Sequence, residues 1–231
     1  KTSLFNFLQH FGLVTVDGNT YGLWHQFLDA FGLIALPDHS NVFAVGYSLF
    51  NMVGQIITLL GVIFLSGYLS NIFGKRNVFI VCLALTAVFT SLFFVVDAKS
   101  VGLIFVINML KSMAYAPTIP LLWAMMGDVA DHSEWVNHRR ATGFVFAGIV
   151  FALKAGLGIG GAICGAIVDS FGFIPNVVQT ESALFGIRIS SSIIPALTFV
   201  VGVLALLFYP ISKHFNEKIQ QELAVRRSNK V

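Results

Sequence analysis

Long apolar runs separated by short polar or charged segments occupy most of the chain. A helix that crosses a membrane needs about 20 mostly apolar residues, and six runs approach or exceed that length. They cover residues 3–35, 42–67, 78–96, 101–126, 142–168 and 185–210. The pattern predicts an all-α integral membrane protein in which residues 1–210 form a six-helix transmembrane bundle and residues 211–231 form a cytoplasmic tail.

The first run is the weakest of the six because a polar segment, residues 17–20, interrupts it near the middle. Polar groups at that depth are tolerated only where protein covers them or where they face water. Asp17 and Asn19 therefore either line a binding surface or lie in a loop between two shorter pieces.

The tail carries Phe215, Ile219 and Leu223 at four-residue spacing among charged residues. Residues four apart share one face of a helix, so the spacing predicts a short amphipathic helix at the inner face of the membrane. The alternative is a solvated tail that only helps to orient the protein.

Composition supports the membrane assignment, since 56% of the residues are hydrophobic and 11% are charged. Soluble domains carry about 25% charged residues. The shortage of charge argues against a soluble enzyme, a nucleic-acid binder and a disordered protein. The formal net charge of +3 is too small to indicate phosphate binding. The expected surroundings are the lipid bilayer, and nucleic acid is not an expected partner.

Basic residues alternate between the two sides of the predicted spans. Connections 68–77 and 127–141, the tail and Lys1 carry ten lysines and arginines, whereas the other connections carry at most two, Lys99 and Arg188. Because cytoplasmic loops are enriched in Lys and Arg, this asymmetry predicts that both ends are cytoplasmic. We expect the bacterial inner membrane.

Two lysines lie inside predicted spans, where an ionised group costs at least about 2.5–3.5 kcal/mol. Lys154 is at least twelve residues from either end of its span, about 18 Å of helix or more, which is too deep for its ammonium to reach the interface easily. It either lines an aqueous cavity as a ligand or forms a structural ion pair between helices. Lys111 is about ten residues into its span and can still extend toward the outer interface.

The span 101–126 also contains a polar and aromatic group around two prolines, which bend a helix as in helices that line transport cavities. Tyr115, Thr118 and Trp123 are candidate substrate-binding residues, together with Lys154, Asp17 and Asn19. Trp123 is either a platform on which a sugar stacks or an aromatic residue of the interfacial belt.

Glycines at helical spacing predict close helix contacts, by Gly161 with Gly165 and by Gly54 with Gly61. His132 and Glu134 do not form a metal site, since no further ligands follow at zinc-like spacing. No catalytic set of Ser, His and Asp or of Cys and His is recognisable. The sequence therefore predicts neither an enzyme nor a metal centre.

The segment 127–135, Gly-Asp-Val-Ala-Asp-His-Ser-Glu-Trp, followed by Arg140 and Gly143, carries a family resemblance. It resembles the pattern A-D-x-x-D-Y-G-E-W/Y-x-x-x-x-R-x-x-G of the glycoside–pentoside–hexuronide:cation symporters of the major facilitator superfamily. His132 and Ser133 replace the usual Tyr-Gly. Segments 172–186 and 222–227 also look like this family's last outer loop and C-terminal tail, and Lys154 falls where members have a lysine.

The resemblance implies the C-terminal half-bundle of a major facilitator fold, helices seven to twelve of twelve. The partner is then the N-terminal six-helix half, which is expected to hold the main site for the coupling cation, Na⁺ or H⁺. No other cofactor is implied. The implied function is symport of a glycoside, pentoside or hexuronide by alternating access. The alternatives are a non-transporting structural membrane domain, or a half-carrier that needs a partner chain.

Charged residues of both signs within the connection 127–141 predict a gate. Asp128, Asp131 and Glu134 are expected to end one helix, and Arg139 and Arg140 to begin the next. Charges in such a loop can pair in one state of a carrier and separate in the other. The alternative is a solvated loop whose arginines only set the orientation of the protein.

Overall fold

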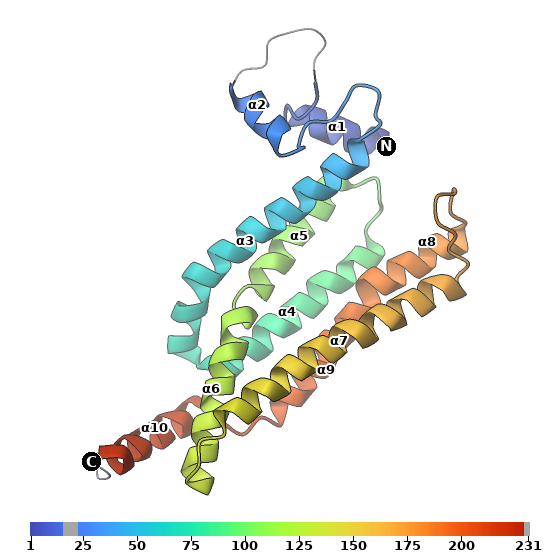
Figure 1. Ribbon diagram of the computed structural model, residues 1–231. Helices are drawn as coiled ribbons and strands as arrows, with labels where there is room; N and C mark the ends of the chain where they lie inside the picture. Colours follow the sequence, from blue (N-terminus) through green and yellow to red (C-terminus); the bar gives the residue numbers. More distant parts are fainter. Residues whose placement is uncertain (16–22, 229–231) are drawn as a thin grey trace.

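The computed structural model describes residues 1–15 and 23–228, which, apart from one isolated β-bridge, form helices and short connections (Figure 1). The elements are α1 (Thr2–His10), α2 (Leu23–Ala30), α3 (Val42–Phe73), α4 (Lys75–Val95), α5 (Val101–Tyr115), α6 (Thr118–Asn137), α7 (Thr142–Ser170), α8 (Glu181–Arg188), the π-helix η1 (Ile189–Ile193), α9 (Ile194–Leu207) and α10 (Lys213–Ser228). The all-α prediction is confirmed for these residues.

Five helical segments of the described part are long and apolar enough to cross a membrane. They are α3, α4, the α5–α6 pair, α7, and the continuous run from α8 through η1 to α9, and each overlaps one of the predicted spans from 42–67 onward. Their lengths of 21 to 37 residues agree with the roughly 20 residues that a hydrocarbon core requires.

The predicted first span, residues 3–35, is wrong as a single membrane helix. The helices in its described part are α1 and α2, of 9 and 8 residues. At 1.5 Å per residue each is less than about 14 Å long, half the thickness of a hydrocarbon core. Five spans in the described residues therefore replace the predicted six. Asp17 and Asn19 lie outside the described residues.

The helices α1 and α2 end early because an eight-residue pattern, Phe-Leu-x-x-Phe-Gly-Leu followed by Val or Ile, occurs twice, at 7–14 and 27–34. In both copies the glycine adopts a positive φ, +69° at Gly12 and +64° at Gly32. The amide of the following leucine then donates to the carbonyl of the leucine five residues earlier, at 2.9 and 3.0 Å. This is the left-handed turn with which many helices end.

The two copies are joined side by side into one small unit, which we call the cap. A parallel β-bridge connects Val14 with Ala35, and the Ala35 amide donates to the Leu13 carbonyl at 2.8 Å. Leu8 and Leu28 are buried beneath it with Val42 of α3. The cap lies over the first turns of α3 and α5 (Figure 1). The repeat has a period of twenty residues in the sequence, which the lengths of the apolar runs do not reveal.

We expect Gly12→Ala and Gly32→Ala each to destabilise the cap by about 1–2 kcal/mol, because alanine is strained in the left-handed region. Amide hydrogen exchange of the peptides that contain Leu8 and Leu28 should speed up by roughly 5- to 30-fold. Gly67→Ala in α3 is the matched control, since an added Cβ there meets open space. Equal exchange in all three variants would contradict the assigned role of the two glycines.

The five spans pack around α4 and α5. α5 lies between α3 and α4, and α4 packs along α9. Close approach of α3 to the next helices depends on the two glycines that the sequence singled out. A Cβ on Gly61 would stand 2.5 Å from the Cβ of Ala116, and one on Gly54 would stand 3.1 Å from Nδ2 of Asn108. The predicted role of Gly54 and Gly61 as contact sites is confirmed.

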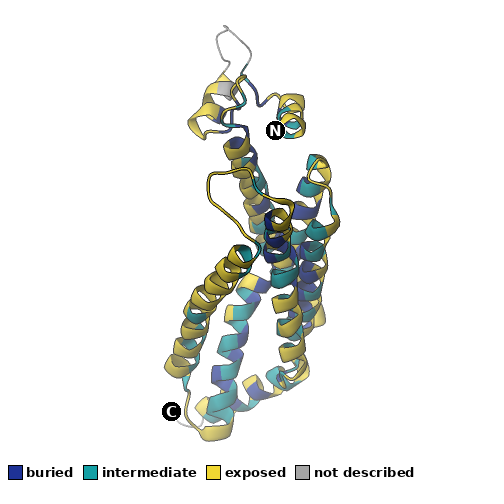
Figure 2. Ribbon diagram, turned by 90° about the vertical axis from the view of Figure 1, so that its right-hand side faces the viewer, coloured by how far each residue is buried: buried dark blue, intermediate teal, exposed yellow. Residues whose placement is uncertain are grey.

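In contrast, α7 is the most exposed span of the described chain, and none of its residues is buried (Figure 2). Added Cβ atoms on Gly161 and Gly165 would meet nothing within 4 Å. The predicted helix contact at this pair is therefore not made by the described residues. The glycines of α7 are therefore exposed on the surface of the bundle.

The two ends of the chain lie at opposite ends of the bundle (Figure 1). Lys1 belongs to the cap, at one end of the bundle. The helix α10 lies at the other end, where α4 begins and α6 ends. The prediction that both ends share one face is wrong, because five crossings rather than six separate them. We call the α10 side the basic end, since it carries Lys75, Arg76, Arg139, Arg140 and the basic residues of α10. By the positive-inside rule the basic end is expected to face the cytoplasm.

Candidate functional site

The last turns of α6 present three carboxylates on one face. Asp128, Asp131 and Glu134 follow one another at intervals of three residues, which aligns side chains along one side of a helix. The predicted connection 127–141 is wrong in extent, because α6 continues to Asn137 and only residues 138–141 join it to α7. The carboxylates therefore stand on a rigid helix rather than in a loop.

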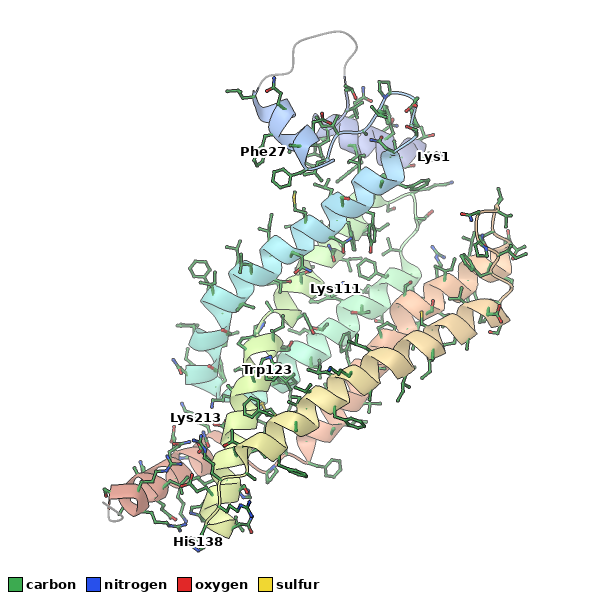
Figure 3. All side chains as sticks on the ribbon, in the orientation of Figure 1. Lys1, Phe27, Lys111, Trp123, His138 and Lys213 are labelled. Carbon is green, nitrogen blue, oxygen red and sulfur yellow. The ribbon has the colours of Figure 1, made fainter. Side chains whose placement is uncertain are left out.

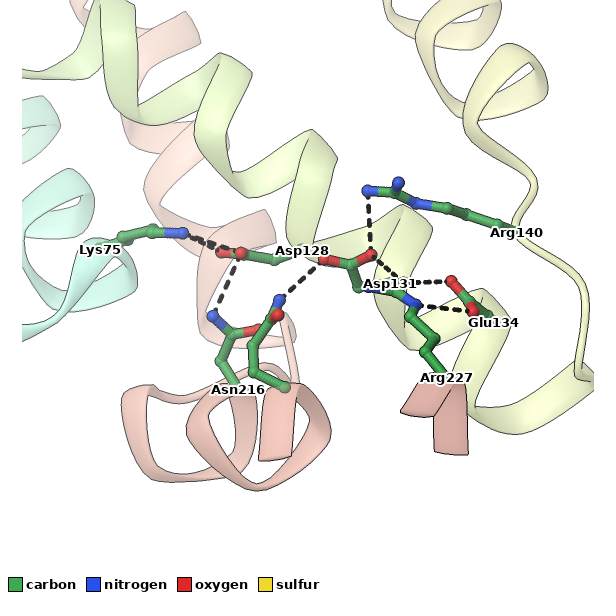
Figure 4. Close-up of polar contacts among 8 residues, drawn as sticks. Lys75, Asp128, Asp131, Glu134, Arg140, Asn216 and Arg227 are labelled. Carbon is green, nitrogen blue, oxygen red and sulfur yellow. Dashed lines mark hydrogen bonds and ion pairs between the residues drawn. The ribbon is translucent and has the colours of Figure 1, made fainter. Parts of the chain in front are cut away.

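Asp128 joins α6 to α4 and α10 (Figure 4). Lys75 Nζ donates to both carboxylate oxygens at 2.8 Å, and Asn216 Nδ2 donates to one of them at 3.1 Å. Asp128 is buried, with 7% of its surface exposed. A buried carboxylate is stable when it is paired and hydrogen-bonded, and here three donated bonds meet that requirement.

Asp131, which is also buried, joins α6 to the start of α7 and to α10. It accepts from Arg140 at 3.0 Å, from Gln220 Nε2 at 2.7 Å and from Arg227 at 3.4 Å. Arg227 also forms a two-bond pair with Glu134. The pKa of Arg227 is raised, chiefly by its hydrogen bond to Glu134. Three carboxylates and their three basic partners thus connect four helices at the basic end.

An aromatic contact seats α10 beside this cluster. The indole Nε1 of Trp135 donates to Glu222 at 2.6 Å, and Arg226 donates to the Trp135 carbonyl at 3.1 Å. The Trp135 ring meets the edge of Phe215 at a centroid distance of 5.7 Å. Ile219 and Leu223, which the sequence assigned to the apolar face of the tail helix, are buried. That face packs on the protein itself, against α6.

The structure brings together four of the five predicted gate residues, Asp128, Asp131, Glu134 and Arg140. The fifth, Arg139, contributes its carbonyl, which accepts a bond from Ser133 Oγ at 3.2 Å. Its side chain is in none of the ion pairs found within residues 1–15 and 23–228. Sequence reasoning missed the partners supplied by α4 and α10, namely Lys75, Asn216, Gln220 and Arg227. Gating by this cluster stays a prediction.

Lys154 lies midway along α7 and is exposed. Neither it nor Lys111 is in an ion pair with a carboxylate of the described chain. Lys111, half-buried on α5, places its Nζ 5.6 Å from the centroid of the Phe93 ring of α4 (Figure 3). Such a cation–π contact is worth about 0.5–2 kcal/mol, less than the cost of about 2.5–3.5 kcal/mol for a lysine in a membrane helix.

The three candidates at the α5–α6 bend have different surroundings. Thr118 is buried and its hydroxyl donates to the Tyr115 carbonyl at 2.6 Å, so it braces the bend and is closed to a substrate. Trp123 stacks on Phe146 of α7 with ring centroids 6.1 Å apart. Tyr115 is 39% exposed and lines a pocket between α3 and α5. The structure does not bring these three side chains together around one open space, and a substrate-binding role for each stays a prediction.

The pocket that Tyr115 lines has a volume of about 290 Å³, and most of its lining residues carry polar side chains although it lies within the membrane-spanning part. Its lining residues are Phe50, Asn51, Gly54, Gln55, Thr58, Asn108, Lys111, Ser112, Tyr115 and Ile119. Asn108 is held by a 2.8 Å bond from Nδ2 to the Phe50 carbonyl. Sequence reasoning missed Asn51, Gln55 and Thr58, although their spacing of four and three residues marks one helix face.

Comparison with known proteins extends this description. Residues 40–213 match the family described as MFS/sugar transport protein. The chain is 25% identical to "Uncharacterized symporter YnaJ" of Bacillus subtilis over 208 residues, 87% of this chain and 45% of that protein. It is 30% identical to "Glucuronide carrier protein homolog" of Escherichia coli over 160 residues, 65% and 35% of the two chains. It is 30% identical to "Putative glycoside/cation symporter YagG" of Escherichia coli over 180 residues, 78% and 39%.

The chain spans less than half the length of each of these three relatives. All three are named as symporters or carriers, which supports a transporter rather than an enzyme and agrees with the resemblance seen in residues 127–143. The membrane-length helices and the bacterial relatives also support an integral membrane protein. Since the match covers most of its length, the chain belongs to the MFS/sugar transport protein family.

Proposed function

We propose that this chain is the C-terminal part of a secondary active carrier that couples uptake of a glycoside, pentoside or hexuronide to Na⁺ or H⁺. The match of residues 40–213 to the sugar transport family carries the proposal. A relative named as a putative glycoside/cation symporter supports the cation coupling. The N-terminal six-helix half is the proposed partner, and we assign the main cation site to it.

In this proposal the cluster at the basic end is one side of a gate. Asp128 and Asp131 hold the ends of α4, α7 and α10 against α6. Alternating access requires contacts that close one side of the carrier and separate when that side opens. The basic partners of these pairs are partly exposed, which suits this role because water can solvate them after the pairs separate.

The test is uptake by the full-length protein reconstituted in proteoliposomes, with panels of glycosides, pentosides and hexuronides. We expect accumulation of at least one sugar class above its equilibrium level when a Na⁺ or H⁺ gradient is applied, and no accumulation when the gradient is collapsed. Absence of uptake across the whole panel under both gradients would contradict the proposal and favour a non-transporting membrane domain.

A further inference from the structure

Two lysines of the membrane-spanning part are in no ion pair with a carboxylate of the described residues. They are Lys111 on α5 and Lys154 on α7, whereas Arg188, which also lies inside its span, donates to the Val96 carbonyl at 3.0 Å. The described acidic residues lie in the cap, in the connections, in the second half of α6, at the end of α7, in the first turn of α8 and on α10. None of these carboxylates lies within ion-pairing distance of either lysine.

Lys111 lies deep in the membrane region. It is ten residues after the first residue of α5, about 15 Å along the helix, which is half of a roughly 30 Å hydrocarbon core. Its ammonium lies beside Phe93, two residues before α4 ends on the side of the cap. The charge is therefore displaced toward the cap end, and the ring offsets only part of its desolvation.

The residues around Lys111 have the chemistry that recognises a sugar. Asn51, Gln55, Ser112 and Tyr115 line the same pocket, and their amides and hydroxyls both donate and accept hydrogen bonds, as sugar hydroxyls do. The exposed ring of Tyr115 offers an apolar face for the C–H side of a pyranose. The volume of about 290 Å³ is at the lower end of the range for small-molecule sites, which suits one sugar ring.

A neutral sugar would satisfy the amides and hydroxyls of this pocket and leave the ammonium without a counter-charge. A sugar acid would satisfy all of them. We infer that Lys111 binds the carboxylate of an acidic sugar in this pocket, so that the substrate is a hexuronide rather than a neutral glycoside or pentoside. The inference rests on the proposed transport function and selects one of its three substrate classes.

The experiment compares two ligands that differ only at C6, 4-nitrophenyl β-D-glucuronide and 4-nitrophenyl β-D-glucoside, for binding to the purified full-length protein. We expect the wild type to prefer the glucuronide. Lys111→Met, which keeps an unbranched side chain one atom shorter and removes the charge, should lower that preference by about 10- to 100-fold, the usual effect of a hydrogen bond to a charged group. Lys111→Arg should retain most of the preference, since it keeps the charge.

Lys99→Met is the matched control, because it removes the same charge from the connection between α4 and α5 and should leave the preference unchanged. A wild type that binds both ligands equally, or a Lys111→Met variant that weakens both alike, would overturn the inference. In that case Lys111 serves the structure or pairs with a carboxylate elsewhere in the protein. Uptake of neutral sugars alone would leave the proposed function standing, whereas no uptake of any sugar would overturn both.

Discussion

We expect Lys154→Ala to abolish cation-coupled sugar uptake by the full-length protein. Lys154 is exposed at the middle of α7, about 18 Å of helix or more from either end of its predicted span. A lysine at such a depth persists only if water or an opposite charge accepts its ammonium. The described chain supplies no such carboxylate. The partner of the ammonium is therefore water in an aqueous cavity or a carboxylate in the rest of the carrier.

If that partner is a carboxylate in the rest of the carrier, removal of Lys154 leaves it without a counter-charge. Truncating one member of a buried charge pair costs about 2–5 kcal/mol, which corresponds to a loss of roughly 30- to 5,000-fold in the affinity of the paired state. Initial rates of sugar uptake, with and without a cation gradient, measure this effect. Lys154→Arg should retain part of the coupling, because it restores the charge with different geometry.

The control for Lys154 is Leu157→Ala, which shortens an exposed side chain one turn further along the same helix. This variant should transport at nearly the wild-type rate and insert into the membrane to the same level. Uptake by Lys154→Ala that keeps its rate and its stimulation by the cation would refute a role for Lys154 in coupling.

The five spans could be predicted from the sequence because length and apolar content alone decide whether a helix crosses a membrane. The cap could not be predicted that way. Its residues are as apolar as a span, but Gly12 and Gly32 end both helices after two or three turns. Apolar content predicts affinity for lipid, but the length of a helix depends on where local turns end it. In the cap, the turns at the two glycines make both helices too short to cross a membrane.

The acidic face of α6 could be recognised from the spacing of Asp128, Asp131 and Glu134. Its partners could not, since Lys75 is 53 residues from Asp128 and Arg227 is 96 residues from Asp131. Local spacing shows which residues share one face of a helix. Only the packing of the helices decides which residues of other helices that face contacts. The pocket around Lys111 follows the same rule, because its two polar faces come from α3 and α5.

Asp131 provides the second large expected effect, the release of α10 from α6. We expect Asp131→Asn to speed amide hydrogen exchange in α10 by roughly 10- to 100-fold, because hydrogen bonds to a charged group contribute about 1.5–3 kcal/mol. Asparagine keeps the size of the side chain and one acceptor oxygen. It removes the charge that Arg140 and Arg227 share, and the half-exposed arginines can then turn to water.

The measurement that separates this effect from a general loss of charge is exchange in Glu217→Gln. Glu217 also lies on α10, but its contact with His214, at 3.8 Å, is made between exposed side chains of the same helix. Such a pair contributes about 0.3–0.5 kcal/mol, so exchange should change by no more than about twofold. If Asp131→Asn behaves like Glu217→Gln, α10 is held by the burial of Ile219 and Leu223 rather than by the ion pairs. A gate opened by separating charges then cannot include α10, and only the contacts of α6 with α4 and α7 remain to close it.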